Sequence, residues 1–156
     1  MAYLILKLFH VLAVIIFIGN ITVGIFWKMY AQKSKDAKRI AFTFNGIIKA
    51  DRIFTMPSVI AILIFGFAAA GGNYNILTTG WIFWSLILFI ISGAAFMAKI
   101  VPLQKKIYAL AGDISKFNWD EYKKLSNQWD LWGCIALITP IIAVVLMVLK
   151  PNLPGI

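Results

Sequence analysis

The chain has 156 residues, of which 62% are hydrophobic and only 13% are charged, and its formal net charge is +9. A soluble globular domain is nearer half apolar and a quarter charged, so this composition excludes such a fold and indicates a membrane protein with several spans. In a membrane protein, basic residues keep loops on the cytoplasmic side and contact anionic lipid. The positive charge therefore does not predict nucleic acid as a partner.

Four apolar runs are long enough to cross a bilayer, whose hydrocarbon core needs about 20 helical residues. They cover residues 3–27, 53–70, 81–101 and 129–149. We expect no cleaved signal peptide, because no basic segment precedes the first run and no small-x-small cleavage site is evident. The prediction is an all-α integral membrane four-helix bundle that forms a single four-span domain over residues 1–156.

The distribution of lysine and arginine sets the expected orientation. Of the 15 basic residues, all but Lys7 and Lys150 lie in the segments 28–52 and 99–128, whereas the segment 71–80 has none. Because loops rich in lysine and arginine stay in the cytoplasm, we expect both long loops to be cytoplasmic and both termini to face outside. The predicted location is a bacterial inner membrane, with anionic lipid at the cytoplasmic face.

The cytoplasmic segments contain helical patterns of their own. Ile40, Phe44, Ile47 and Ile48 recur at helical spacing among basic residues. This pattern predicts an amphipathic helix that either lies on the membrane surface or extends the second span into the cytoplasm. We expect Pro57 to kink this helix.

Three further local signals concern helix ends and the cysteine. Asn118 is followed by Trp119 and two acidic residues, which is typical of an N-cap, so the fourth helix is expected to begin near residue 119. The run Gly71-Gly72-Asn73 is expected to end the second helix and turn the chain. The single cysteine, Cys134, lies in an apolar run and is expected to be a buried small hydrophobic residue.

The first helix carries the chain's single histidine. Spacing of 3.6 residues places six side chains on one broad face: Lys7, His10, Phe17, Asn20, Gly24 and Trp27. This face is expected to point into the bundle, because lipid does not tolerate a histidine and an asparagine. Lys7 is explained most simply as a residue whose ammonium reaches the outer interface.

Two interpretations of His10 stay open. In one, neutral His10 hydrogen-bonds a neighbouring helix and fixes the packing. In the other, it ligates a haem iron or relays a proton, because an ionisable residue within a span is a candidate functional residue. One axial imidazole is enough to hold haem b, and the second ligand would be Met147, expected near the same side of the membrane, or a histidine from a second copy.

A second polar stripe, at helical positions i, i+4 and i+7, consists of Asp51, Thr55 and Ser58. Asp51 is expected to form a local ion pair with Arg52 at the cytoplasmic mouth of the bundle. Asp130, just inside the fourth span, is expected to pair with Lys99 or Arg52. We interpret these pairs as structural rather than catalytic.

Signatures of familiar enzymes are absent from the sequence. It contains no glycine-rich phosphate loop, no G-x-S-x-G motif and no cluster of histidine, cysteine and aspartate. With one histidine and one cysteine, a zinc or copper site within a single chain is not expected. The sequence therefore favours a protein without catalytic residues over an enzyme.

Most of the chain resembles a bacterial family of predicted integral membrane proteins of unknown function, catalogued as domain of unknown function 2269. The resemblance begins at Leu6-Lys7-Leu8-Phe9-His10-Val11-Leu12 and Phe17-Ile18-Gly19, and continues through Ala50-Asp51-Arg52 with Pro57, Gly80-Trp81, Trp129-x-x-Trp132-Gly133, Pro140 and residues 146–151. It implies a four-helix membrane domain and assigns no activity.

A more distant resemblance concerns the pattern Lys7-x-x-His10, followed by an aromatic residue and a glycine. The first helix of HemJ-type protoporphyrinogen oxidases and of copper-resistance D-like proteins begins in a similar way. In the HemJ type this histidine is associated with haem b, and a lysine follows a tryptophan in the third helix. The chain has Phe17 where tryptophan is usual and Ser85 where that lysine would stand, so the resemblance does not extend to porphyrinogen oxidation.

Three hypotheses for the function follow. The first is a non-catalytic accessory or assembly subunit that uses its helices to bind another membrane protein or a second copy of itself. The second is a haem-b-binding redox protein with His10 as axial ligand. The third is a small transporter in which Lys7, His10 and Asn20 line a path.

Overall fold

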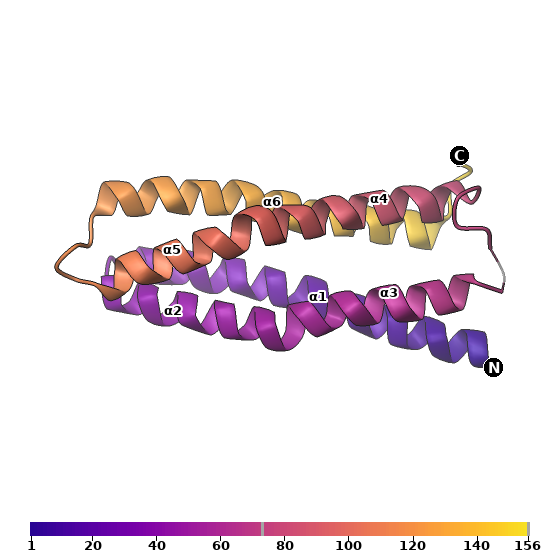
Figure 1. Ribbon diagram of the computed structural model, residues 1–156, viewed down its shortest axis with the longest axis horizontal. Helices are drawn as coiled ribbons and strands as arrows, with labels where there is room; N and C mark the ends of the chain where they lie inside the picture. The colour runs from indigo at the N-terminus through magenta and orange to yellow at the C-terminus, as the bar shows by residue number, and fades with distance from the viewer. Residues whose placement is uncertain (73, 156) are drawn as a thin grey trace.

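The computed structural model describes residues 1–72 and 74–155, which form four long helical rods (Figure 1). The rods are α1 (Ala2–Lys33), then α2 (Ala37–Ala50) continued by η1 (Asp51–Thr55) and α3 (Met56–Ala70), then α4 (Gly80–Ala95) continued by η2 (Phe96–Ile100) and α5 (Val101–Gly112), and α6 (Trp119–Leu149). The described residues contain no strand. The all-α prediction is therefore confirmed.

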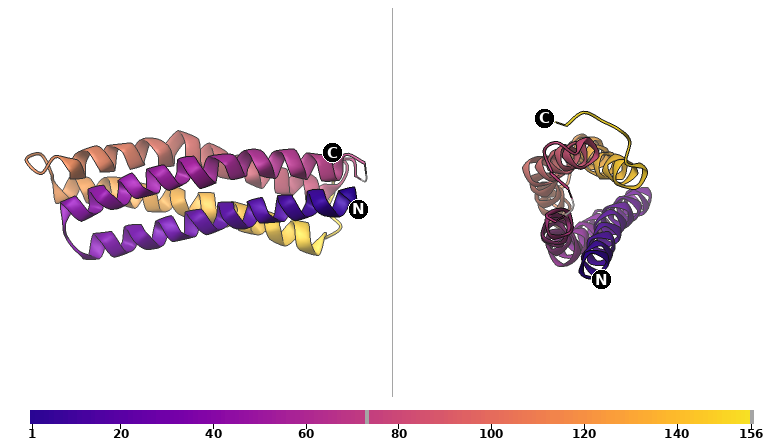
Figure 2. Two further views of the ribbon diagram at one scale, coloured as in Figure 1. Left: turned by 90° about the horizontal axis from the view of Figure 1, so that it is seen from below. Right: turned by 90° about the vertical axis from the view of Figure 1, so that its right-hand side faces the viewer.

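The bundle has two distinct ends (Figures 1 and 2). Both chain termini and the connection between α3 and α4 lie at one end, which we call the terminal end. The connections 34–36 and 113–118 lie at the other, which we call the basic end. Seen along the rods, the four are arranged around a common axis (Figure 2).

Each rod is longer than a bilayer is thick. The four rods have 31 to 34 residues and are apolar enough to cross a membrane. At a rise of about 1.5 Å per residue, each is about 48 Å long, whereas the hydrocarbon core measures about 30 Å. The predicted spans lie at the terminal end of these rods, so the rods continue beyond the spans at the basic end. The helix at residues 37–50 is thus an extension of the second span, and not a separate helix on the membrane surface.

Side-chain caps explain two of the helix starts. The Asp36 carboxylate accepts a hydrogen bond from the backbone N–H of Lys38, at the start of α2. The Asn118 side chain accepts from the backbone N–H groups of residues 120 and 121, and α6 begins at Trp119, as predicted. Acidic residues in the first turn of α6 also complement the helix dipole.

The ends of α3 and α6 follow their local sequence. Gly71 caps α3, as predicted, whereas Asn73 lies outside the described residues. Lys150 caps α6 in the left-handed conformation, with φ 48°, and Pro151 follows it. Proline disfavours helical backbone in the residue before it, which explains why α6 ends at this point.

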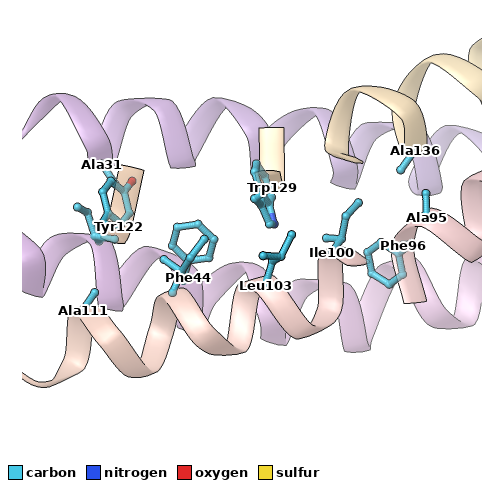
Figure 3. Packing of buried hydrophobic residues seen from close by; sticks show 12 residues of the cluster. Ala31, Phe44, Ala95, Phe96, Ile100, Leu103, Ala111, Tyr122, Trp129 and Ala136 are labelled. Atoms are coloured by element: carbon cyan, nitrogen blue, oxygen red, sulfur yellow. The ribbon is translucent and has the colours of Figure 1, made fainter. Parts of the chain in front are cut away.

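The largest hydrophobic core lies at the basic end and around the middle of the bundle (Figure 3). It consists of Ala31, Ile40, Phe44, Ala95, Phe96, Ile100, Leu103, Ile107, Ala111, Tyr122, Trp129 and Ala136. The rings of Phe44 and Trp129 meet edge to face, with centroids 5.7 Å apart. Ile40, Phe44 and Ile47 are all buried, so the predicted apolar face of α2 is confirmed.

The terminal half is packed as two helix pairs. The pair α1–α3 encloses a smaller core of Ala13, Phe17, Ile21 and Ile62. The pair α4–α6 is joined by the buried hydroxyl of Ser92, which donates to the carbonyl of Ala136 at 2.7 Å. In the described part of the chain, the backbone of α3 does not closely approach that of α4 or α6, although Phe89 of α4 and Leu137 of α6 pack against the smaller core. The two pairs therefore separate toward the terminal end.

Two π-helical turns interrupt the middle rods, each just before a proline. Met56 N–H donates to the carbonyl of Asp51, five residues back, and Val101 N–H donates likewise to Phe96. Pro57 and Pro102 lack the N–H group that an α-helix requires, and their rings crowd the carbonyl four residues back. A widened turn relieves this conflict without breaking the rod. We expected Pro57 to kink this rod, and the structure has a π-turn over Asp51–Thr55, just before Pro57.

Replacing Phe44 by alanine tests whether the core at the basic end stabilises the bundle. Phe44 is 0% exposed, and truncating a fully buried phenylalanine is expected to lower the free energy of unfolding by about 3–5 kcal/mol. Phe42 is on the same helix and 80% exposed, so Phe42→Ala should change it by less than about 0.5 kcal/mol. Unfolding by SDS, followed by tryptophan fluorescence, measures both. Equal effects would contradict the assigned orientation of α2.

Candidate functional site

A cavity of about 640 Å³ lies between the two helix pairs at the terminal end. We call it the terminal cavity. Its walls come from α1, α3, α4 and α6 and are mostly apolar, while its polar and ionisable lining residues are Tyr3, Lys7, His10, Tyr74, Trp81, Ser85 and Lys150. This volume is within the range of cavities that bind small molecules and cofactors, which is about 300–1,000 Å³.

His10 lies in the wall of this cavity, and its orientation is fixed by α3. Its Nδ1 atom is 2.9 Å from the carbonyl oxygen of Ile62. A carbonyl only accepts hydrogen bonds, so Nδ1 carries the proton and Nε2 keeps its lone pair in the neutral ring. Among the described residues, Nε2 has no hydrogen-bond partner. His10 therefore hydrogen-bonds a neighbouring helix, as the first interpretation expected. Its other nitrogen is available, and the interpretation of His10 as a ligand or proton relay stays a prediction.

Gly66 makes this position of the imidazole possible. A Cβ atom at Gly66 would lie 3.0 Å from both Cε1 and Nδ1 of His10, closer than side chains normally approach. The absence of a side chain on α3 thus leaves the space that the ring of His10 occupies. Phe9, the residue before His10, stacks on Phe65 with ring centroids 5.2 Å apart, which also aligns α1 with α3.

Met147 and Ser85 reach the same cavity from the other helix pair. The structure therefore places both candidate haem ligands of the sequence analysis, His10 and Met147, in one cavity. The hydroxyl of Ser85 is buried and donates to the carbonyls of Trp81 at 2.7 Å and Ala143 at 3.2 Å. Ser85 therefore serves helix packing and supplies no ionisable group at the position where the HemJ type has a lysine.

Two lysines border the terminal cavity near the chain ends. Lys7 is exposed, as expected for a side chain that reaches the interface. The ammonium of Lys150 lies over the rings of Tyr74, at 5.6 Å, and Trp81, at 5.1 Å. One cation comes from each helix pair, so the apolar cavity carries positive charge on both sides of its rim.

A separate polar cluster surrounds Asp51, near the middle of the bundle. One carboxylate oxygen accepts hydrogen bonds from Asn20 and Thr55, both at 2.9 Å, and the other accepts from Gln104 at 2.8 Å. The expected ion pair of Asp51 with Arg52 is wrong, because Arg52 is exposed and no such pair occurs in the described residues. Adjacent residues of a helix point in different directions, which explains this outcome.

The expected partner of Asp130 is also wrong. Asp130 pairs with Lys28 at 2.6 Å, and not with Lys99 or Arg52. The Lys28 side chain is only 2% exposed, whereas that of Asp130 is 43% exposed. The apolar positions Phe17 and Ile21, together with Ala31, share a buried face with Lys28. Because Lys28 shares helical spacing with these residues, the sequence could have distinguished it from the lysines and arginines of the loops.

Two other residues lie differently from their expected positions, and a third had no expected role. Trp27 is exposed, so the buried face of α1 is rotated away from it relative to the prediction. Cys134 is exposed rather than buried, and it lines a second groove of about 460 Å³ between α1 and α6. Gln104 was not singled out at all, because a glutamine in a basic cytoplasmic segment carries no distinguishing pattern.

The described residues contain no group of three or more histidine, cysteine, aspartate or glutamate side chains that would hold a metal ion. What the terminal cavity offers instead is one imidazole lone pair, one thioether, apolar walls and two ammonium groups at the rim. This set suits an amphiphilic ligand with negative charge at one end and a group that an imidazole can ligate.

A family model described as "Predicted integral membrane protein (DUF2269)" matches residues 4–151. No curated protein and no solved structure matches the chain. The more distant resemblance to HemJ-type proteins therefore stays a prediction.

The ion pair predicts an asymmetric response to mutation. Asp130→Asn leaves the buried ammonium of Lys28 without a counter-charge, which should cost about 2–3 kcal/mol of unfolding free energy. Lys28→Met should cost less, because methionine suits a buried position and the remaining Asp130 is partly exposed. SDS unfolding of both variants and of the double variant measures the coupling. Equal losses would contradict the burial assigned to Lys28.

Proposed function

We propose that this chain, which belongs to the family of predicted integral membrane proteins DUF2269, binds haem b in the terminal cavity and serves in electron transfer within the membrane. The observation that carries the proposal is the free Nε2 atom of His10 in a cavity of about 640 Å³. A haem ligand requires this tautomer, with the ring held through its other nitrogen. The sequence favoured an accessory subunit, and the cavity gives the haem hypothesis more support.

The cavity residues fit haem b in three respects. His10 would supply a nitrogen ligand to the iron, and Met147, which lines the cavity from the opposite helix pair, would supply a thioether. The apolar walls suit a porphyrin ring. Lys7 and Lys150 supply positive charge at the rim, where the two propionates of haem need it. Bound haem would supply reversible one-electron chemistry, and the protein residues would hold and orient it.

We also propose the orientation of the bundle. In a bacterial inner membrane, the basic end would be cytoplasmic and would contact anionic lipid, and both termini would face outside. The support is the concentration of lysine and arginine in residues 28–52 and 99–128. The terminal cavity then belongs to the outer half of the membrane, away from the cytoplasm.

The absorption spectrum tests haem binding directly. Protein purified in mild detergent from haem-replete cells is expected to show a Soret band, and His10→Ala should abolish it because the axial nitrogen is lost. Gly93→Ala is a matched control within a span, since a Cβ there meets nothing within 4 Å, and it should keep the band. A colourless wild type that also fails to bind added haem would overturn the proposal.

Two cavity variants refine this test. Met147→Leu is expected to keep haem but to change the spectrum from a six-coordinate to a five-coordinate form, because leucine has no ligating atom. Gly66→Ala should weaken haem binding, because its methyl group would displace the ring of His10. An unchanged spectrum of Met147→Leu would assign the second axial position to another group, such as a histidine from a second copy.

The accessory-subunit hypothesis is favoured by a different observation, the groove between α1 and α6. It is lined by Ile25, Lys28, Met29, Gln32, Lys33, Asp130 and Cys134. Asp130 in this groove is ionisable and partly exposed next to apolar helix faces. Such a residue suits a contact with a polar residue of another helix. The hypothesis stays a prediction, and the groove is where such a partner would bind.

Cys134 provides the test of this second candidate, because it is the chain's single cysteine and is exposed in the groove. Treatment of native membranes with a short bismaleimide should give a discrete cross-linked species if a copy or partner with a nearby cysteine binds there, and Cys134→Ser should abolish it. Recovery of monomer only would count against a close cysteine-bearing partner at this groove.

The transporter hypothesis receives no comparable support. Lys7 and His10 line the terminal cavity, but Asn20 is not among its lining residues. Instead, Asn20 donates hydrogen bonds to Asp51 and Thr55. The three residues therefore do not form one continuous path through the described bundle.

A further inference from the structure

The segment that follows α6 packs against the start of α4, although it forms no helix. We call residues 151–155 the strap. It leaves the end of α6 and passes alongside the first turns of α4 (Figure 2). The indole Nε1–H of Trp84, on α4, donates to the carbonyl of Pro154 at 3.1 Å. This hydrogen bond anchors an otherwise irregular segment to a helix.

Two glycines let the backbone of the strap lie directly against its neighbours. A Cβ atom at Gly80 would overlap the backbone carbonyl of Leu153. A Cβ atom at Gly155 would overlap the backbone of Leu77 and Thr78, in the connection before α4. Because neither position has room for a side chain, these contacts give the strap a defined place on α4.

Lys150 joins the strap to α6 and is held at both its backbone and its ammonium. Its φ of 48° is left-handed, which is uncommon for a residue other than glycine, and Pro151 disfavours the helical alternative. The ammonium lies over the rings of Tyr74 and Trp81. These two rings meet edge to face, with centroids 5.2 Å apart. The position of the ammonium is therefore set by the fold.

This ammonium keeps its hydrogen-bonding capacity. A lysine has three N–H donors, and the face of an aromatic ring attracts the charge without removing it. Among the described residues, Lys150 forms no ion pair. Tyr74, Trp81 and Lys150 all line the terminal cavity. The cluster therefore presents a positioned positive charge, without a carboxylate partner, at the rim of the cavity.

Lys7, the other cation at the rim, is not held in this way. It is exposed and forms neither an ion pair nor a cation–π contact in the described part of the chain. A free lysine loses rotamer freedom when it binds a ligand, whereas Lys150 has already lost this freedom on folding. A group that is positioned in advance binds more tightly, because this cost is removed from the binding step.

We propose that Lys150, positioned by the strap, is the residue through which the terminal cavity recognises a free carboxylate of its ligand and rejects the corresponding ester. This inference rests on the proposed binding of haem b and adds what selects its acid groups. Trp84 and Leu153 do not line the cavity, so they act as positioning residues that reach the ligand only through Lys150.

Haem b and its dimethyl ester test the recognition of the carboxylate. Full-length protein in lipid nanodiscs is titrated with each, and the Soret band reports binding. Lys150→Gln should weaken haem binding by at least about tenfold, as expected for a lost contact between charged groups, and weaken ester binding much less. Lys150→Arg should keep the preference for haem, because it keeps the charge. Comparison of each variant with the wild type cancels the different partition of the two porphyrins into lipid.

Two variants outside the cavity test the role of the strap. Trp84→Phe keeps an aromatic ring but removes the N–H group that binds Pro154. Gly80→Ala places a methyl group where the carbonyl of Leu153 lies, which displaces the strap. Both should reduce the preference for haem over the ester, and Gly80→Ala should reduce it more. Gly93→Ala, where a Cβ meets nothing within 4 Å, should keep the preference.

The outcomes separate this inference from the haem proposal. If the wild type binds neither porphyrin, haem binding fails and the inference fails with it. If both bind and Lys150→Gln weakens them equally, only the inference is overturned. A larger loss of haem affinity in Lys7→Gln than in Lys150→Gln would contradict the advantage assigned to the positioned cation.

The role of the strap has its own contradiction. An unchanged preference for haem in folded Gly80→Ala and Trp84→Phe would show that the strap does not position Lys150. If Gly80→Ala does not fold, Trp84→Phe alone decides the matter, because it adds no atom to the contact between the strap and α4.

Discussion

The length of the helices relative to the bilayer is the constraint on which the rest of the structure depends. Rods of 31 to 34 residues extend well beyond the hydrocarbon core. The part in water must bury its apolar side chains, so the hydrophobic effect packs the basic end tightly around Phe44, Ile107 and Trp129. Within lipid, apolar side chains gain little by leaving a neighbouring hydrocarbon chain. The helix pairs can therefore separate at the terminal end and leave a cavity between them.

Polar contacts join the rods to one another. The Lys28–Asp130 pair links α1 to α6, and the hydrogen bonds of Asp51 link the second rod to α1 and α5. Both π-turns precede a proline, Pro57 or Pro102. These polar contacts join all four rods, while the terminal half presents the cavity.

In the terminal cavity, the small residue Gly66 determines how the imidazole of His10 is oriented. Gly66 leaves room for the ring of His10 to reach the carbonyl of Ile62, and that hydrogen bond fixes the tautomer. Without this space, the histidine would have to rotate and its free nitrogen would be aimed elsewhere. The candidate site therefore depends as much on the backbone of α3 as on the histidine itself.

The sequence by itself determined what depends on local pattern. Four apolar runs, the apolar face around Phe44 and the Asn118 cap were all predictable, because length, periodicity and capping act within one segment. Only the tertiary structure decided which polar groups meet. It paired Asp130 with Lys28, 102 positions away in the chain, and joined Gln104 to Asp51, 53 positions away. The physical reason is that a helix apolar on nearly all sides gives no signal for its rotation about its own axis. That rotation sets every contact between helices.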